Sequence, residues 1–400
     1  MHSFHEILGL SAPEKKSLGV AYTPSEILQQ PDAWRETAAL VETHGRELGA
    51  FLRAARCHPG GDGMILLLGA GTSEYIGTSV EDSMRRNLQV PVQTVPTTSF
   101  ITHPVDLIIR GRPYLLVHFA RSGDSPESLG SYDHARNMLP DSCHLVITCN
   151  REGKLARAAA HDDKAFTVLL PERTNDRSLA MTSSFSSMAV AALAVARLES
   201  MAAFRGDIDA AARAASRLLT ESVDKVQTFA EKAGSRIQFL GTGGCYGAMK
   251  ESRLKVLEMT DGRIAANVET FLGLRHGPRV FVDRECLVVA SVSRDMHRRR
   301  YETDLLRDLR AARQGRYTLA LCDHVTPDLN GLADEILALA PTGVDLIDDL
   351  RVVTDVIVGQ LIGLFASLKL GLKPDAPSAS GVINRVVSGV HIYPREGPAA

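Results

Sequence analysis

Two stretches of the sequence share one pattern: MILLLGAGTSEYIGTS at residues 64–79 and IQFLGTGGCYGAMKES at residues 237–252. Each begins with an apolar run typical of a buried strand, continues through a glycine-rich turn and ends in the start of a helix. The two stretches begin about 170 residues apart, and a repeat of that length has the size of a domain. The sequence therefore predicts two similar domains in tandem.

Three more apolar runs recur in the same order and at a similar spacing. The pairs are YLLVHFA with CLVVASV, HLVIT with YTLAL, and AFTVLLP with EILALAP. All of these runs are short and unalternating, and helical stretches separate them, which predicts a parallel sheet covered on both faces. We therefore expect the α/β class, with two domains that are each a three-layer αβα sandwich.

The limits of the repeat give the expected domain boundaries. Residues 1–35 form an N-terminal extension, residues 36–205 the first domain and residues 206–380 the second domain. The last stretch, residues 381–400, lies outside the repeat and is expected to form a tail.

Composition excludes several classes of protein. The chain has 400 residues, of which 44% are hydrophobic and 23% charged, and a net charge of -2 gives no basic field for nucleic acid. No apolar run reaches the roughly 18–20 residues of a membrane span, and the start MHSFHEILGL does not have the pattern of a secretory signal. Six scattered cysteines are typical of reduced thiols. We therefore expect a cytoplasmic protein that binds neither nucleic acid nor membrane.

The loops after the strands are the first places to look for a ligand, because parallel sheets bind ligands at the carboxyl ends of their strands. The turns GAGTSE and GTGGCY lack the third glycine of a dinucleotide-binding loop, since Glu74 and Tyr246 stand there. We therefore expect no nicotinamide cofactor. Thr72 and Ser73 place two hydroxyls at a helix N-terminus, where they either cap the helix or bind substrate.

The loop ARSGDSPES, residues 120–128, is a candidate phosphate site. Ser122 and Ser125 flank Gly123 after a buried strand, and hydroxyls, free amides and a helix dipole together favour a dianion. A capping box with Ser125 as the cap explains the same pattern. Arg121 is either a further phosphate ligand or a solvated surface residue.

A second hydroxyl cluster, AMTSSFSS, opens the long apolar helix that closes the first half. Its residues Thr182 and Ser183 either line the substrate site or cap that helix.

A possible proton-transfer site lies in the second half. Glu251, Lys255 and Glu258 fall on one helix face, where such a trio is either catalytic or a solvated ion-pair face. His276 stands in a stiff His-Gly-Pro turn. The sequence has no His, Cys, Asp and Glu cluster with metal-ligand spacing, so we expect no metal.

These motifs carry a resemblance. The repeated glycine-rich turn, the SGDS loop, the ExxxKxxE helix and the RHGP corner resemble the double sugar-isomerase (SIS) domain family. The resemblance runs from about residue 38 to the C-terminus. Within this family, TNDRSLAMTSSF, NVETFLGLRHGP and GVINRVVSGVHIY resemble the AgaS proteins, described as tagatose-6-phosphate ketose/aldose isomerases or galactosamine-6-phosphate deaminases.

The resemblance implies roles for the matching residues. Glu258 would move the proton between C1 and C2, and Lys255 would lie beside the oxygens of those carbons. His276 would open the sugar ring, in a homodimer or higher oligomer whose subunits share active sites. Ser122 and Ser125 would hold the phosphate, and the Thr-Ser pair of the first glycine-rich turn would line the same pocket.

Two positions depart from the family's glutamine–fructose-6-phosphate aminotransferase. Arg385 stands where that enzyme has a tail lysine, and an arginine stays protonated and cannot form a Schiff base. Arg121 replaces a glutamine, so some phosphate contacts would pass to its guanidinium.

The resemblance implies a cofactor-independent deaminating isomerase that converts an amino-sugar 6-phosphate, galactosamine 6-phosphate above all, to tagatose 6-phosphate and ammonia. A plain tagatose-6-phosphate ketose/aldose isomerase and a glucosamine-6-phosphate deaminase are alternatives that the sequence leaves open. A non-catalytic sugar-phosphate sensor is an alternative of another class, and the intact Glu–Lys–His set argues against it.

Overall fold

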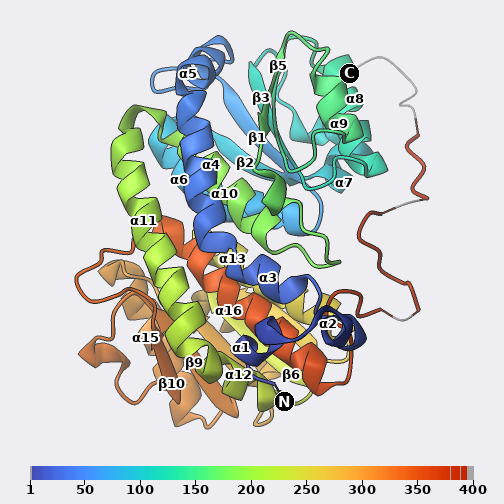
Figure 1. Ribbon diagram of the computed structural model, residues 1–400. Helices are drawn as coiled ribbons and strands as arrows, with labels where there is room; N and C mark the ends of the chain where they lie inside the picture. Colours follow the sequence, from blue (N-terminus) through green and yellow to red (C-terminus); the bar gives the residue numbers. More distant parts are fainter. Residues whose placement is uncertain (1, 379, 388, 394–400) are drawn as a thin grey trace. The chain divides into compact units, whose positions relative to one another are not determined.

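The computed structural model describes residues 2–378, 380–387 and 389–393 (Figure 1). The chain forms two compact units, and we describe each by itself. The A unit comprises residues 36–175, 184–205 and the described part of 384–400. The B unit comprises the described parts of 1–35 and 206–383 together with 176–183.

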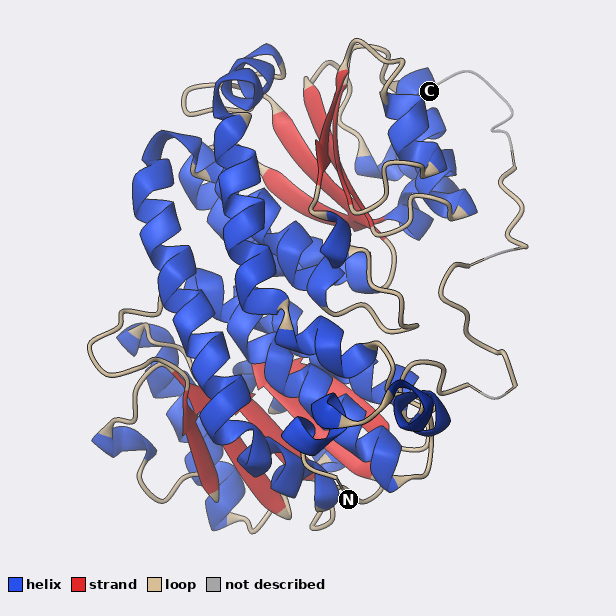
Figure 2. Ribbon diagram, viewed as in Figure 1, coloured by secondary structure: helices blue, strands red, loops and turns tan. Residues whose placement is uncertain are grey.

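The A unit is built on a five-stranded parallel sheet with the order β2-β1-β3-β4-β5. Both central strands β1 and β3 are buried along their whole length, as the unbroken apolar runs predict. Figure 2 shows helices packed around the sheet. The elements are α5 (Gly45–Ala54), β1 (Met64–Gly69), α6 (Thr72–Leu88), β2 (Val92–Pro96), α7 (Thr97–Thr102), η1 (Pro104–Leu107), β3 (Tyr114–Ala120), α8 (Pro126–Met138), β4 (Cys143–Thr148), α9 (Lys154–Ala159), β5 (Ala165–Leu169), η2 (Glu172–Thr174), α10 (Ser183–Ala196, which starts at the last residue of a B-unit segment) and η3 (Leu198–Ser200).

The B unit has a second five-stranded parallel sheet, with the order β10-β9-β8-β6-β7. Its elements are α1 (Phe4–Gly9), α2 (Ala12–Leu18), α3 (Thr23–Leu28), η4 (Leu218–Ser222), α12 (Val223–Glu231), β6 (Arg236–Gly241), α13 (Gly244–Met259), β7 (Ala265–Thr270), α14 (Phe271–Leu274), η5 (Pro278–Phe281), β8 (Leu287–Ser291), α15 (Met296–Ala311), β9 (Tyr317–Cys322), η6 (Pro327–Leu329), β10 (Glu335–Ala338) and α16 (Asp348–Lys369). Helices α4 (Gln30–Thr43) and α11 (Met201–Arg217) contain residues of both units.

The two sheets have the same topology. Strands β6 to β10 follow one another across the second sheet in the order in which β1 to β5 cross the first. Two parallel sheets with flanking helices confirm the predicted α/β class. The comparison of the two halves of the sequence missed β7, because its residues AANVET are half-buried or exposed and form no apolar run.

The N-terminal extension is helical where it is described, and it packs within the B unit. The carboxylate of Asp375 accepts hydrogen bonds from the backbone N–H groups of Tyr22 and Thr23 at the start of α3. Glu26 accepts hydrogen bonds from Ser178. These contacts attach the extension to the segments that lead into α10 and away from α16.

Helix α16 forms the core of the B unit and supports α13. By length and composition α16 could cross a membrane, but 89% of its most apolar window is buried inside the fold. Two glycines bring α13 close to it: a Cβ on Gly359 would lie 2.2 Å from the Cβ of Ser252, and one on Gly363 would lie 3.0 Å from the carbonyl oxygen of Lys255. The backbone around Lys255 is therefore held against α16.

Each sheet has one point where the strand order reverses, between β1 and β3 in the A unit and between β6 and β8 in the B unit. Ligands of open α/β sheets bind outside the carboxyl ends of the strands at such a point. In the A unit the loops at this point are 70–71 and 121–125, and in the B unit they are 242–243 and 292–295.

Candidate functional site

The candidate phosphate loop follows β3 in the A unit and is held by the chain that follows β4. Gly123 has a φ of +68°, which favours glycine, and its carbonyl oxygen accepts a hydrogen bond from the N–H of Leu155. The side chain of Asn150 donates to the carbonyl oxygen of Ser122 at 2.9 Å. The loop is therefore fixed before any ligand arrives, as an anion site needs to be.

The hydroxyls of this loop serve local structure and are still partly accessible. The Ser125 hydroxyl accepts from the N–H of Ser128 at 3.2 Å, so Ser125 caps α8, and the Ser122 hydroxyl accepts from the N–H of Asp124 at 3.3 Å. Both serines are half-buried. Capping and anion binding therefore do not exclude each other here, because a cap uses one lone pair of the oxygen.

Thr72 and Ser73 are the first residues of α6, the helix that follows the neighbouring strand β1. Both are buried, with 5% and 8% of their surface exposed. Because β1 and β3 are paired in parallel, the loops after them both lie at the carboxyl ends of the strands of this sheet. The structure thus brings both hydroxyl pairs to the reversal point of the A unit.

Arg121 connects the loop to the tail. Only 7% of its surface is exposed, so the expectation of a solvated surface residue is wrong. Its guanidinium donates to the carbonyl oxygen of Arg385 at 2.5 Å, and Arg385 donates in turn to the side chain of Asn175 at 2.8 Å. Arg121 therefore holds the tail backbone beside the phosphate loop.

The Glu–Lys–Glu trio lies on α13 in the B unit. The ammonium of Lys255 is 3.1 Å from Glu251 Oε1 and 2.5 Å from Glu258 Oε2. Lys255 and Glu251 are completely buried, whereas 22% of the Glu258 side chain is exposed. The alternative of a solvated ion-pair face is therefore wrong for two of the three residues.

The charges of this trio assign different chemistry to its members. Burial lowers the pKa of Lys255, but the two adjacent carboxylates outweigh burial and raise that pKa above its ordinary value. Lys255 therefore stays protonated and can support a developing negative charge, but it cannot act as a base. Of the two carboxylates, Glu258 is the one that solvent reaches.

His276 stands at an exposed corner of the B unit. The corner follows α14, and the N–H of His276 donates to the carbonyl oxygen of Gly273 at 3.0 Å. Gly277 adopts a φ of +121°, which a residue with a side chain rarely adopts. This turn projects the histidine from the folded unit.

Thr182 and Ser183 are completely buried at the start of α10. The hydroxyls of both donate to the carboxylate of Asp176, which also accepts from the N–H of Thr182 at 2.7 Å. Sequence reasoning did not identify Asp176. Its place in the TNDRS segment was the available signal.

Carboxylates from α15 and α16 already contact the B-unit counterpart of the candidate phosphate loop. Asp348 accepts from the N–H groups of Arg294 and Asp295 at 2.9 and 3.3 Å and from the Ser293 hydroxyl. Glu302 accepts from the N–H of Ser293 at 2.6 Å, and burial raises the pKa of Glu302 to about 6. These carboxylates already accept hydrogen bonds from the N–H and hydroxyl groups that would otherwise bind an anion, and no motif in the sequence indicated these contacts.

The described residues contain no group of three or more His, Cys, Asp and Glu side chains arranged to hold a metal ion. The candidate residues supply hydroxyls, amides and guanidinium groups in the A unit, and carboxylates, an ammonium and an imidazole in the B unit.

Comparison with known proteins places these residues in a family. The chain is 37% identical over 375 residues to the D-galactosamine-6-phosphate deaminase AgaS of Escherichia coli, covering 93% of this chain and 96% of that protein. The crystal structure of tagatose-6-phosphate ketose/aldose isomerase from Escherichia coli superposes with a TM-score of 0.83 at 34% identity, covering 94% of this chain and 97% of that one.

A more distant structure shows the fold alone. The C-terminal domain of glucosamine–fructose-6-phosphate aminotransferase from Francisella tularensis superposes with a TM-score of 0.72 at 18% identity, covering 89% of this chain and 98% of that one. No family model matches the chain.

Proposed function

Because this chain belongs to the AgaS family of double SIS-domain proteins, we propose that it is a deaminating isomerase of an amino-sugar 6-phosphate. Its substrate is galactosamine 6-phosphate, and its products are tagatose 6-phosphate and ammonia. The observation that carries the proposal is the buried, protonated Lys255 beside the solvent-reachable carboxylate of Glu258. A helix face whose role was only solubility would not bury a lysine.

The phosphate binds at the loop that contains Ser122 and Ser125. This loop precedes α8, so hydroxyls, backbone amides and the helix dipole all favour a dianion there. Thr72 and Ser73 extend the same edge of the sheet. The B-unit counterpart is a poorer site, because Asp348 and Glu302 already accept hydrogen bonds from its loop.

The reaction needs a proton acceptor and support for negative charge. His276 assists opening of the sugar ring. Glu258 removes the proton from C2 of the open-chain amino aldose, and the ammonium of Lys255 stabilises the enolic oxygen on C1 that results. Return of the proton to C1 leaves an imine at C2. Water adds to that imine, and ammonia leaves to give the ketose.

The remaining polar residues would shape this site. Arg385 lies in the tail segment that Arg121 holds beside the phosphate loop. It contributes positive charge but no Schiff base, because a guanidinium stays protonated. Thr182 and Ser183 both donate hydrogen bonds to the carboxylate of Asp176, so they contribute to substrate binding through that carboxylate.

The proposal includes a homodimer in the cytoplasm. His276 is exposed on a rigid corner, so it is available to complete the active site of a neighbouring subunit. Size-exclusion chromatography with light scattering measures the oligomeric state, and a monomer that is fully active contradicts a shared site.

One assay separates the candidate functions. Purified protein is mixed in turn with galactosamine 6-phosphate, glucosamine 6-phosphate and tagatose 6-phosphate, and ammonia and sugar products are quantified together. The proposal expects ammonia and ketose from galactosamine 6-phosphate. If aldose forms from tagatose 6-phosphate and neither amino sugar releases ammonia, the result would favour a ketose/aldose isomerase, the activity for which the similar Escherichia coli structure is named. Binding without turnover would favour a sensor.

A further inference from the structure

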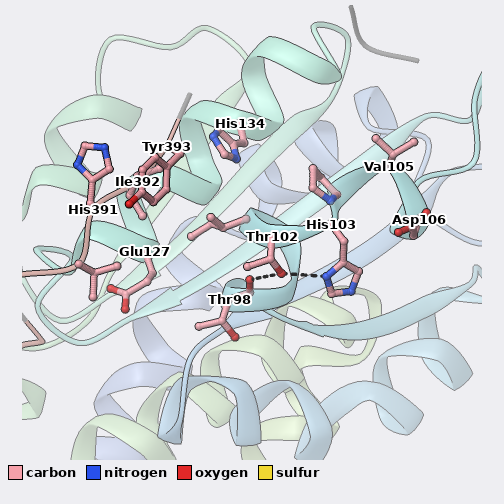
Figure 3. Close-up of a pocket in the computed structure, with 13 residues that line it drawn as sticks. Thr98, Thr102, His103, Val105, Asp106, Glu127, His134, His391, Ile392 and Tyr393 are labelled. Atoms are coloured by element: carbon pink, nitrogen blue, oxygen red, sulfur yellow. Dashed lines mark hydrogen bonds between the residues drawn. The ribbon is translucent and has the colours of Figure 1, made fainter. Parts of the chain in front are cut away.

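The A unit contains a cavity that the proposed reaction does not use. Its volume is about 690 Å³, within the range of small-molecule sites. Helix α7 and η1 form one wall, α8 forms another, and tail residues 390–393 form a third (Figure 3). None of the residues proposed to bind the phosphorylated substrate lines this cavity.

Two polar side chains of α8, Glu127 and His134, line the cavity. Oε2 of Glu127 and Nδ1 of His134 both belong to residues that line the cavity, and neither atom has a hydrogen-bond partner among the described residues. A buried polar atom without a partner is unfavourable. The two residues are seven positions apart, so they lie on one face of the helix. Both atoms are enclosed by the fold, so a ligand in the cavity would reach the other carboxylate oxygen of Glu127 and Nε2 of His134.

The other lining residues define the chemistry of that ligand. The lining includes the carboxylates of Glu127 and Asp106, and among the described residues no lysine or arginine lines it, which disfavours a phosphate. Histidines and threonines supply the other polar groups of the lining, and Ile101 and Tyr393 supply apolar surface. A small amine with hydroxyl groups and one apolar face matches this set.

We propose that this cavity binds an unphosphorylated amino sugar. Its ammonium pairs with Glu127, a hydroxyl hydrogen bonds to His134, and the less polar face of its ring lies against Tyr393. The proposal depends on the cavity and not on the proposed reaction.

The tail is part of this site and is positioned by α8. A Cβ added to Gly130 would lie 3.0 Å from two side-chain carbons of Ile392, so the glycine allows the tail to pack closely against the helix. A ligand under the tail would therefore reduce hydrogen exchange at tail residues 389–393 and in α8.

Calorimetric titration with galactosamine at pH 6.5, where such an amine is protonated, tests the proposal. We expect one site per chain, weakened about tenfold or more by Glu127→Gln, which keeps the size of the side chain and removes its charge. N-acetylgalactosamine lacks the ammonium and should bind about tenfold or more weakly as well. Hydrogen exchange should show protection in α8 and the tail.

Two variants keep the test independent of folding and of the active site. If Glu127→Gln lowers the melting temperature, His134→Gln serves as the second variant in which galactosamine binding should be weakened. Glu258→Gln alters the proposed active site at the carbon that carries the amine and should leave galactosamine binding unchanged. The proposal is overturned by absence of binding, by binding that Glu127→Gln does not weaken, or by binding that Glu258→Gln abolishes. The titration involves no turnover, so an inactive protein in the ammonia assay leaves it valid.

Discussion

Replacing Glu258 by glutamine tests the proposed base. The amide keeps the size of the side chain but cannot accept the C2 proton, so turnover should fall by about 10² to 10⁴, the usual contribution of a positioned base. Lys255 would keep its 3.1 Å contact with Glu251, and the phosphate loop would be untouched. Protein stability and substrate binding should therefore change much less than turnover.

The assay follows ammonia release together with incorporation of solvent deuterium at C2 of recovered substrate and C1 of product. Both should be nearly lost in Glu258→Gln. Glu221→Gln is a matched control, since that glutamate forms an exposed ion pair with Arg217 that is worth less than about 1 kcal/mol. A Glu258→Gln protein that exchanges deuterium at the wild-type rate would refute this reasoning, and Glu251 or Glu269 would then be the next candidates.

Three further changes have expected outcomes. Ser122→Ala should raise KM for the phosphorylated substrate about 10- to 100-fold through loss of a charge-assisted hydrogen bond of about 1.5–3 kcal/mol, whereas a Ser128→Ala control should change KM little, and an unchanged KM in Ser122→Ala would place the phosphate elsewhere. Burial lowers the pKa of His144 to about 4. As the pH falls below about 6.5, His144 therefore binds a proton in the unfolded chain but not in the folded chain. The contribution of His144 to stability should therefore fall by about 2 kcal/mol between pH 6.5 and 5, and His144→Gln should change the pH dependence of the unfolding free energy by about that amount in denaturant titrations, while an identical slope in both proteins would argue against it. Gly363→Ala should destabilise the protein by about 1–3 kcal/mol and lower turnover, because the new methyl group meets the backbone of Lys255, and a melting temperature equal to that of the wild type would contradict this packing.

Local patterns allowed the strands and most candidate residues to be located. The runs that became β1 and β3 are apolar except for His118 because both faces of a parallel sheet are covered, and such runs are easily recognised in a sequence. Glycine-rich turns and hydroxyl clusters stand directly after them. Strand β7 was missed because a partly buried edge strand needs no apolar run.

Contacts between distant residues could not be predicted in this way. Nothing in the sequence near Arg121 shows that its guanidinium meets the backbone of Arg385 in the tail. Likewise, the ExxxKxxE spacing is the same for a surface helix and a buried one. Only the packing of α13 on α16 shows that Lys255 is enclosed while Glu258 stays accessible.

The most direct test of the central claim uses galactosamine 6-phosphate labelled with ¹⁵N at C2. The wild-type protein should release the label as ammonium at the rate at which tagatose 6-phosphate appears, one nitrogen for each ketose, as followed by nuclear magnetic resonance. A label that stays on the sugar, while the protein interconverts tagatose 6-phosphate and its aldose, would contradict deamination.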